Sequence, residues 1–516
     1  MDDAKCEKKQ GFSSFHNCKV RKAEQGCSGA IFAATIEKKM ASTPSPIDNF
    51  VQASYTAFEA YRSISLRDRA RFLEQIAMEL DVVAEGLIET AAAETHLAPG
   101  RLRTELQRTQ WQLYSYGKAC AEGNWLDIRI DTGGAGNRES GIGNGGAADT
   151  QRQSNDWRNV PRQNDLRKML VPLGPVVVFG ASNFPFAYST AGGDTACALA
   201  AGCPVILKAH PAHAATSRMV AEAVRHAAVA LNLPEAVFQH VEGGIEEGQA
   251  LVLHPLVRAV GFTGSLEGGR ALFDLASRRA EPIPVFAEMG SINPVFLLPE
   301  YLATQTEDLA KQYVASITAS AGQACTNPGL LVGVESAALT RFQELLAAEM
   351  AIVPPAEMLH PGIAKAFQHK RADALETKGV EVAGTLSCPV GKNESIPTLA
   401  TVSGDDFLSN PLLQEEVFGP YSLLVRCRNK EQMLEVARNL RGQLTCTVMA
   451  TSKDMNEYPA LLPLLRERCG RLVRNGVPTG VEVVPAMMHG GPYPATTDSR
   501  FTAVGADGIQ RFARYF

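Results

Sequence analysis

The sequence predicts an α/β fold with an open, mostly parallel sheet, on three observations. From residue 170 onward, short apolar segments alternate with helical segments, as in strands joined by right-handed crossover helices. Polar motifs follow several of these apolar segments, at the edge where parallel strands bind ligands. The chain has 516 residues, of which 45% are hydrophobic and 20% charged. This is more residues than one hydrophobic core usually holds. We therefore expect two or three domains.

Charge and cysteine usage narrow the class of partner. A formal net charge of -5 and the lack of a long basic segment argue against nucleic acid or an anionic membrane, and favour a small molecule. The 11 cysteines are scattered and form no CxxC pair, so we predict neither a disulfide framework nor a metal site. No secretory segment or membrane-spanning run of about 18 apolar residues is present. A cytoplasmic location is expected.

The N-terminal part of the chain divides into a charged segment and a helical one. Residues 1–45 are rich in charge with little apolar periodicity, which predicts disorder. From Asp48 to about Ala93, apolar residues recur at helical spacing and predict two amphipathic helices. A further helix is predicted after Pro99-Gly100.

A glycine-rich stretch follows between Asp131 and Asp149. Within it, GIGNGG (Gly141 to Gly146) matches the GxGxxG dinucleotide pattern by letter. That pattern binds phosphate only between a strand and a helix, and neither flanks it here. We interpret the stretch as a flexible insertion.

Strands and helices alternate after this insertion. The helix of GGDTACALAA separates the first two strand segments, and the others follow in the same alternation. The predicted strand segments are MLVPLGPVVVFGA, GCPVILKAHPA, AVFQHVEG, AVGFTGS and PIPVFAE.

Three polar motifs fall at the ends of these strands. In ASNFPF, Asn183 either caps a turn or directs an amide N–H at an oxygen that becomes negative during a reaction. In GFTGSLEGGR, Gly264 and Ser265 open a helix, as an ordinary cap or as a phosphate site. In FAEMGSINP, Glu288 ends a buried strand and needs a raised pKa or a partner, so it is a general base or part of a salt bridge.

Cys325 lies in AGQACTNPG, on a bend between glycine, amide and proline residues rather than inside an apolar run. A buried thiol that serves packing alone is the alternative. With Glu288 and Asn183, Cys325 completes a set for covalent catalysis at a carbonyl group, namely a nucleophile, a base and an oxyanion donor.

In these motifs the sequence resembles the aldehyde dehydrogenase superfamily, from about Pro46 to Phe516. The motifs that carry the resemblance occur in family order and are SNFP, the lysine of ILKAHP, GFTGS, AEMG, GQACTNPG and EEVFGP. Longer segments, such as GGDTACALAAGCPVILKAHPAH and PTGVEVVPAMMHGGPYPATTDSR, resemble the α-ketoglutarate semialdehyde (2,5-dioxovalerate) dehydrogenases.

The resemblance implies an aldehyde dehydrogenase-like fold with three parts. A Rossmann-type cofactor-binding domain would comprise residues 46–130 and 170–288. An α/β catalytic domain would comprise residues 289–495. A small β oligomerisation ribbon, which carries the glycine-rich insertion, would comprise residues 131–169 and 496–516, in a homodimer or homotetramer.

The resemblance also implies roles for individual residues. Cys325 would attack the aldehyde, Asn183 and the backbone N–H of Cys325 would hold the oxyanion, and Glu288 would activate the hydrolytic water. The implied cofactor contacts are Lys208, Gly264, Ser265, Glu416 and Phe418.

The cofactor and substrate are predicted from neighbouring positions. Pro211 replaces a glutamate that NAD-preferring relatives often carry, so we predict NADP with NAD tolerated. On one helix face, Glu105, Arg108 and Gln112 recur at i, i+3 and i+7, and Arg108 is predicted to bind a substrate carboxylate. The alternative is a solvated Arg108–Glu105 surface pair. Phe184 and Gln112 are further substrate candidates.

The expected reaction is NAD(P)-dependent oxidation of α-ketoglutarate semialdehyde to α-ketoglutarate. Oxidation of a fatty or other aldehyde is the alternative within the family. A thiol-dependent hydrolase or acyltransferase, or an inactive interaction scaffold, is the alternative from another class.

Overall fold

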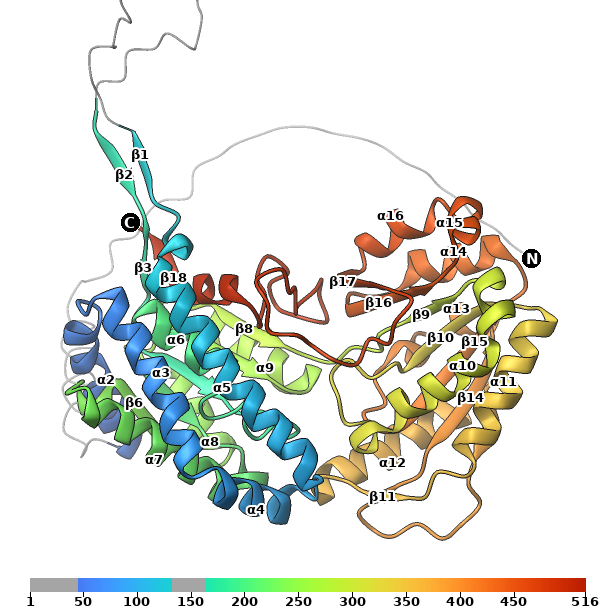
Figure 1. Cartoon of the computed structure of the whole chain (residues 1–516), viewed down its shortest axis with the longest axis horizontal. Coiled ribbons are helices and arrows are strands. Elements are labelled where there is room, and N and C mark those ends of the chain that lie inside the picture. The colour runs from blue at the N-terminus through green and yellow to red at the C-terminus, as the bar shows by residue number, and fades with distance from the viewer. Residues whose placement is uncertain (1–44, 132–163) are drawn as a thin grey trace, which may run out of the picture. The chain divides into compact units, whose positions relative to one another are not determined.

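The computed structural model describes residues 45–131 and 164–516, and residues 46–516 form one compact unit (Figure 1). The predictions for residues 1–44 and for the insertion at 132–163, Gly141 to Gly146 included, lie outside the described residues. In the part that is described, no helix combines the length and apolar character needed to cross a membrane.

The helices before the first sheet differ from the prediction in number. They are α2 (Pro46–Tyr61), α3 (Leu66–Val82), α4 (Ala84–Thr95) and α5 (Pro99–Glu122). The helix after Pro99 is confirmed, but the two helices predicted from Asp48 to Ala93 are three. Val83 alone separates α3 from α4, with a non-helical ψ of 12° and its N–H bonded to the Asp81 carbonyl. A one-residue break barely disturbs the apolar spacing, so periodicity could not reveal it.

A five-stranded parallel sheet occupies the first half of the unit, in the order β6-β5-β4-β7-β8. Its strands are β4 (Val176–Phe179), β5 (Val205–Lys208), β6 (Phe238–Val241), β7 (Ala259–Thr263) and β8 (Val285–Glu288). Its helices are α6 (Gly193–Ala201), α7 (Ala214–Ala230), α8 (Ile245–Leu253) and α9 (Leu266–Ser277). This arrangement confirms the predicted open α/β sheet.

Both faces of this sheet are buried, which explains the continuous apolar runs of its strands. Val176 and Val178 of β4 pack into a core that also contains Phe72 of α3. Val177, between them, faces the opposite core with Val51 of α2. Successive side chains of a strand point to opposite faces, and here both faces are buried. An apolar residue is therefore favoured at every position.

A seven-stranded sheet follows, in the order β12-β14-β15-β10-β9-β16-β17, parallel except for the edge strand β12. Its strands are β9 (Val295–Leu297), β10 (Leu330–Val334), β12 (Glu381–Thr385), β14 (Thr398–Ser403), β15 (Tyr421–Cys427), β16 (Gln443–Met449) and β17 (Cys469–Arg474). The helices around it are α10 (Pro299–Thr318), α11 (Ala337–Met350), α12 (Pro361–Glu376), α13 (Gly404–Ser409), α14 (Lys430–Asn439), α15 (Ser452–Glu457) and α16 (Leu461–Arg466).

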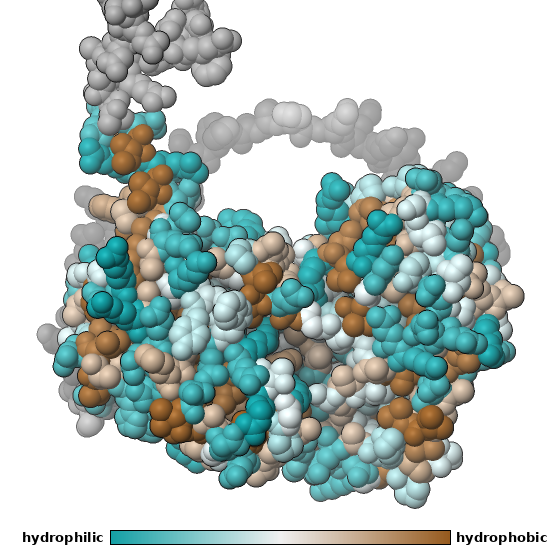
Figure 2. All heavy atoms as spheres, viewed as in Figure 1, coloured by the Kyte–Doolittle hydropathy of each residue, from teal (hydrophilic) through white to brown (hydrophobic). Residues whose placement is uncertain are grey.

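Short antiparallel pairs complete the described fold. They are β1 (Arg129–Asp131) with β2 (Leu166–Lys168), β3 (Leu170–Pro172) with β18 (Ala513–Tyr515), and β11 (Ala356–Glu357) with β13 (Glu394–Ser395). The β1–β2 ribbon extends away from the sheets (Figure 1). Its apolar side chains are exposed, Ile130 at 58% and Leu166 at 63%. Figure 2 shows brown, hydrophobic groups on the exposed ribbon.

Candidate active site

One cavity of about 670 Å³ brings together the predicted catalytic and cofactor residues. It is lined by the carboxyl ends of the five-stranded sheet, by the loop that carries Cys325, and by α12. The predicted residues that line it are Asn183, Lys208, Gly264, Ser265, Glu288, Cys325, Glu416 and Phe418. The cavity therefore lies at the carboxyl edge of the sheet, where the sequence predicted a ligand site.

The loop that presents Cys325 has a strained backbone. Ser320, Ala321 and Gly322 are consecutive residues with left-handed φ values of 51°, 55° and 66°. Non-glycine residues rarely adopt this conformation, and its cost is often found at functional sites. A Cβ added to Gly322 would lie 2.2 Å from the carbonyl carbon of Gly419. The chain needs this glycine to turn the loop back toward the cavity.

Side-chain amides hold the loop in place. The Nδ2 group of Asn293 donates to the carbonyls of Cys325 and Asn327, both at 2.9 Å. The Asn183 amide donates to the carbonyl of Gln323 at 3.1 Å, and Gln323 accepts from the N–H of Leu359 through its own side chain. These bonds leave Ala324 and Cys325 partly exposed, while Gln323 before them and Thr326 after them are buried. The thiol thus lines the cavity instead of lying inside an apolar core.

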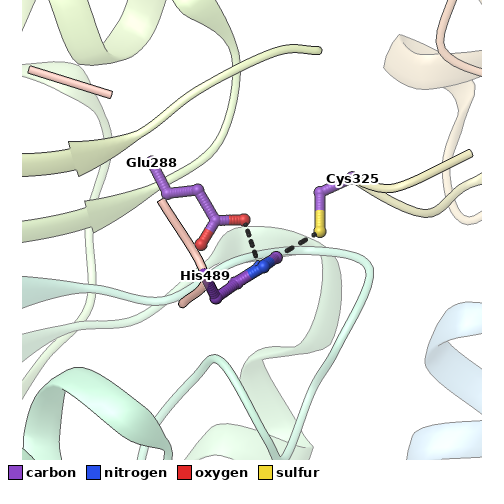
Figure 3. A group of neighbouring side chains, drawn as sticks. All are labelled: Glu288, Cys325 and His489. Carbon is purple, nitrogen blue, oxygen red and sulfur yellow. Dashed lines mark hydrogen bonds and ion pairs between the residues drawn. The ribbon is translucent and has the colours of Figure 1, made fainter. Parts of the chain in front are cut away.

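Glu288 has a partner, His489, that the sequence did not suggest. An oxygen of Glu288 lies 2.9 Å from Nε2 of His489, and both side chains are buried (Figure 3). The same Nε2 lies 3.6 Å from Sγ of Cys325. Burial raises the pKa of Glu288, but the neighbouring imidazole of His489 holds it below its usual value. The sequence predicted either a raised pKa or a partner for Glu288. The raised pKa is wrong, and the partner is His489.

The thiol is neutral in this environment. Burial raises the pKa of Cys325 well above its usual value, and the charge of Glu288 raises it further. A neutral thiol is a poor nucleophile, so attack requires a group that takes its proton. His489 is a base within reach, since its Nε2 lies 3.6 Å from Sγ.

Two guanidinium groups lie on another side of the thiol. Arg108 donates to the Tyr188 hydroxyl at 3.0 Å, and the Tyr188 ring lies 5.9 Å from the ring of His489. The positive charge of Arg108 acts to lower the pKa of Cys325. Arg471 is also close enough to interact electrostatically with Cys325 and Tyr188. Arg108 was named as a candidate from the sequence, and Arg471 was not.

The predicted alternative for Arg108, a solvated pair with Glu105, is wrong. Glu105 is only 4% exposed and pairs with Arg101 at 3.1 Å. It also accepts from the N–H groups of Phe186 and Ala187, at 2.9 and 3.0 Å. Glu105 thus fixes the loop after Asn183 and leaves Arg108 to other partners.

None of the predicted substrate residues, Arg108 included, is part of the lining of this cavity. Gln112 is 1% exposed and lies against the backbone of Gly193, so it belongs to the packing between α5 and α6. Phe184 packs edge-on against Tyr188 at 5.3 Å and below the guanidinium of Arg101 at 4.8 Å. Phe184 therefore supports the tyrosine that contacts Arg108.

The far end of the cavity carries the groups predicted to bind the cofactor. Ser265 accepts from the N–H of Gly268 at 3.1 Å and caps α9, so the predicted N-cap is observed. Lys208 donates to the carbonyls of Ala209 and Gly243. Gly264 lines the cavity, and a Cβ there would lie 2.6 Å from the Phe262 ring, so this turn favours glycine.

Comparisons with known proteins agree with this geometry. The model of the aldehyde dehydrogenase family matches residues 32–492. The chain is 44% identical to alpha-ketoglutaric semialdehyde dehydrogenase 2 of Azospirillum brasilense, over 91% of this chain and 85% of the relative. It is 41% identical to the alpha-ketoglutaric semialdehyde dehydrogenase of Acinetobacter baylyi, over 92% of this chain and 86% of that one.

A solved structure shows the same fold at low identity. Succinic semialdehyde dehydrogenase from Streptococcus pyogenes, in complex with NADP+, superposes with a TM-score of 0.72 at 16% identity, over 92% of this chain and 95% of that one. The chain belongs to the aldehyde dehydrogenase family, and it is an NAD(P)-dependent aldehyde dehydrogenase. The predicted fold and the resemblance are confirmed, and the hydrolase and scaffold alternatives lose their support.

His489, Asn293 and Arg471 are the site residues that sequence reasoning missed. His489 lies in MMHGGP, inside a segment that contributed to the resemblance without a role for any residue. The available signal was a histidine followed by two glycines and a proline, a polar turn in a chain of only 10 histidines. Arg471 lies in β17, where alternation alone does not say which face meets the cavity.

Proposed function

We propose that this enzyme oxidises α-ketoglutarate semialdehyde to α-ketoglutarate, with NADP preferred and NAD tolerated. The observation that carries the proposal is a neutral thiol, Cys325, that contacts His489 and shares one cavity with Glu288, Asn183 and the predicted cofactor residues. The names of the relatives at 44% and 41% identity support this substrate.

In the first half-reaction, the His489 tautomer with its proton on Nδ1 accepts the thiol proton at Nε2, and Sγ forms a bond to the aldehyde carbon. The negative charge moves to the aldehyde oxygen. One N–H of the Asn183 amide is bonded to the Gln323 carbonyl, and the other is free to donate to this oxygen together with the backbone N–H of Cys325.

The nicotinamide cofactor, when bound, accepts the hydride that leaves the aldehyde carbon and converts the adduct to a thioester. The backbone N–H of Ser265, before α9, would hold the pyrophosphate, since the N–H of Gly264 already donates to the carbonyl of Glu288 at 3.0 Å. Lys208 would contact the adenosine ribose, and Glu416 and Phe418 the nicotinamide half. Pro211 lines the cavity and carries no charge that would repel a 2′-phosphate, which supports NADP.

In the second half-reaction, Glu288 accepts a proton from water, whose oxygen attacks the thioester carbon and releases the Cys325 thiolate. The lowered pKa of Glu288 keeps it ionised near neutral pH, and so able to accept this proton. Since Nε2 of His489 contacts both Glu288 and Sγ, it can return a proton to the sulfur.

The substrate carboxylate would bind between Arg108 and Arg471. Both guanidinium groups interact with the surroundings of Cys325, and the Nε atom of each is buried without a hydrogen-bond partner. An unpaired buried donor favours a ligand that satisfies it.

Features outside the cavity support two further proposals, one on how copies of the chain assemble and one on the cellular location of the enzyme. The exposed apolar ribbon at Ile130 and Leu166 would pair with another copy, in a dimer or tetramer. All of the described cysteines are unpaired, which supports a reducing, cytoplasmic setting.

The test is reduction of NADP, followed by absorbance, with α-ketoglutarate semialdehyde as substrate. We expect turnover with the native enzyme and none with Cys325→Ala, while Cys388→Ala, which alters another partly exposed thiol, serves as the control. A higher kcat/KM for NAD than for NADP would overturn the cofactor preference. A higher kcat/KM for a fatty aldehyde of any length than for α-ketoglutarate semialdehyde would overturn the proposed substrate.

A further inference from the structure

Three side chains with metal-binding atoms converge beside the cavity (Figure 3). Sγ of Cys325, Nε2 of His489 and a carboxylate oxygen of Glu288 lie within 4.8 Å of one another. Cys325 lies in the loop before β10, His489 in the segment after β17, and Glu288 at the end of β8. The three residues are therefore far apart in the sequence. No spacing in the chain could indicate this group, and among the described residues no second group of three such ligands occurs.

We propose that Cys325, His489 and Glu288 bind one soft divalent cation, Zn²⁺, and that the bound ion holds the enzyme in a reversible inactive state. Thiolate, imidazole and carboxylate are the ligands that zinc takes in proteins, and three protein ligands with one open position are common. Magnesium and calcium, which require several oxygen ligands, do not fit this set.

The geometry is close to that of a zinc site. Tetrahedral bonds of about 2.3 Å to sulfur and about 2.0 Å to nitrogen place those two atoms about 3.6 Å apart. Sγ and Nε2 are 3.6 Å apart in the structure. The corresponding nitrogen–oxygen separation is about 3.4 Å, so the carboxylate oxygen, now 2.9 Å from Nε2, needs to withdraw by about 0.5 Å.

Charge favours the ion as well. Glu288 is 4% exposed, and neither of its oxygens has a well-aligned hydrogen-bond donor. A thiolate beside this carboxylate would place two negative charges in a buried site, and a divalent cation neutralises both. Binding replaces the S–H bond by an S–Zn bond and releases the thiol proton to solvent. No electron is transferred, because zinc has no accessible redox change.

Zinc at this position has a defined consequence for activity. The sulfur lone pair that attacks the aldehyde is engaged by the metal, and the imidazole nitrogen that takes the proton is engaged as well. The open fourth position faces the cavity, which Cys325 and Glu288 both line, and would hold a water molecule. The thiol is then blocked and also protected from alkylation until a chelator removes the ion.

Cobalt(II) is the probe for the site, since it replaces zinc and absorbs through a thiolate-to-metal charge-transfer band. The full-length protein without cofactor is titrated, with Cys6, Cys18 and Cys27 replaced by serine because their positions are outside the described residues. We expect one Co²⁺ per chain, displacement by Zn²⁺ but not by Mg²⁺, and release of a proton measured in weakly buffered solution. Activity should be lost with zinc and return with EDTA.

Variants separate a three-ligand site from a lone thiol. Cys325→Ser should abolish the band, and Cys388→Ser should leave it unchanged. His489→Gln and Glu288→Gln should each weaken cobalt affinity by about tenfold or more, with circular dichroism and iodoacetamide labelling of Cys325 as checks on folding. Unchanged cobalt affinity in both of these variants would show that the Cys325 thiol binds the metal without help from His489 or Glu288. A band that persists in Cys325→Ser would place the metal elsewhere, and either result overturns the proposal.

Discussion

At the scale of single residues, His489 contacts both groups that act in the two half-reactions. If it takes the thiol proton, His489→Gln should slow the formation of the thioester by roughly 10²–10⁴-fold. The measurement is the pre-steady-state burst of reduced cofactor, which should disappear. Glu288→Gln is the matched comparison, because it should keep the burst and lower only the steady-state rate. A normal burst in His489→Gln would assign the histidine a positioning role.

Arg108 and Arg471 are expected to discriminate substrates by charge. Loss of one charge-assisted contact of about 1.5–3 kcal/mol corresponds to a tenfold or greater rise in KM. Arg108→Ala and Arg471→Ala should each produce this rise for α-ketoglutarate semialdehyde, and neither should alter KM for an uncharged aldehyde of equal length. Arg103→Ala, on the exposed side of α5 where Arg103 pairs with Glu85, is the control. Equal effects on both substrates would reject the carboxylate site.

Glu416 is expected to make cofactor binding depend on pH. Burial raises its pKa to about 7, so the carboxylate is ionised above pH 7 and protonated below it. If it accepts from ribose hydroxyl groups, Kd should rise by up to about tenfold from pH 8 to pH 6. NAD is the ligand to use, because it lacks the 2′-phosphate that titrates near pH 6.

Two substitutions test this pH dependence. Glu416→Gln should remove it, whereas Glu267→Gln should not, because the pKa of Glu267 lies below its usual value and its charge is constant over this range. The raised pKa of Glu416 also means that the folded protein keeps a proton that the unfolded chain loses. This group therefore lowers stability as pH rises toward 7. A flat Kd in the native enzyme would separate Glu416 from the cofactor.

At the scale of elements, the loop before Cys325 depends on one glycine. Gly322→Ala forces a Cβ into the backbone of Gly419, which has to move together with the loop. We expect Gly322→Ala to lower the free energy of unfolding by about 2 kcal/mol or more and to slow iodoacetamide labelling of Cys325. Thermal unfolding and labelling rates measure the two effects.

Ala321 provides the comparison for this loop. It has a similar φ of 55°, a conformation that glycine adopts at little steric cost. Ala321→Gly should therefore change stability by less than about 1 kcal/mol. If the two substitutions had the same effect, the close approach at Gly322 would not control the loop.

Elements were predictable where the evidence was local. The strands from Val176 to Glu288 follow from their largely buried apolar runs, and α5 from the proline at its start. The break at Val83 was missed because it leaves helical spacing almost intact. The burial of Glu105 and Gln112 was missed because a polar residue on a helix gives no sign of which surface will cover it.

At the scale of the whole molecule, the β1–β2 ribbon is expected to join copies of the chain. Ile130→Asp together with Leu166→Asp places charge on both strands and should convert the native oligomer to a smaller species, measured by light scattering after gel filtration. Ile352→Asp, at a residue that is 73% exposed outside the ribbon, is the control. An unchanged mass in the ribbon variant would place the subunit interface elsewhere.

The sequence by itself determined the α/β class, the carboxyl ends of β4 and β8 and the residue types at those ends, because each depends on neighbours along the chain. It therefore indicated Asn183, Glu288 and Cys325, and the convergence of Asn183 and Glu288 followed from the rule that parallel strands share a carboxyl edge. Cys325 lies in the loop before β10 of the other sheet, so its approach to this edge was decided by the packing of the two sheets.

Only the tertiary structure decided which distant groups meet that edge. His489 pairs with Glu288 across about two hundred residues of chain, and Arg471 approaches Cys325 from another strand. Such contacts depend on how whole layers pack, and packing is set by many weak interactions that no local pattern encodes. The same contacts set the pKa of Glu288 below its usual value, where the sequence alone allowed a raised one.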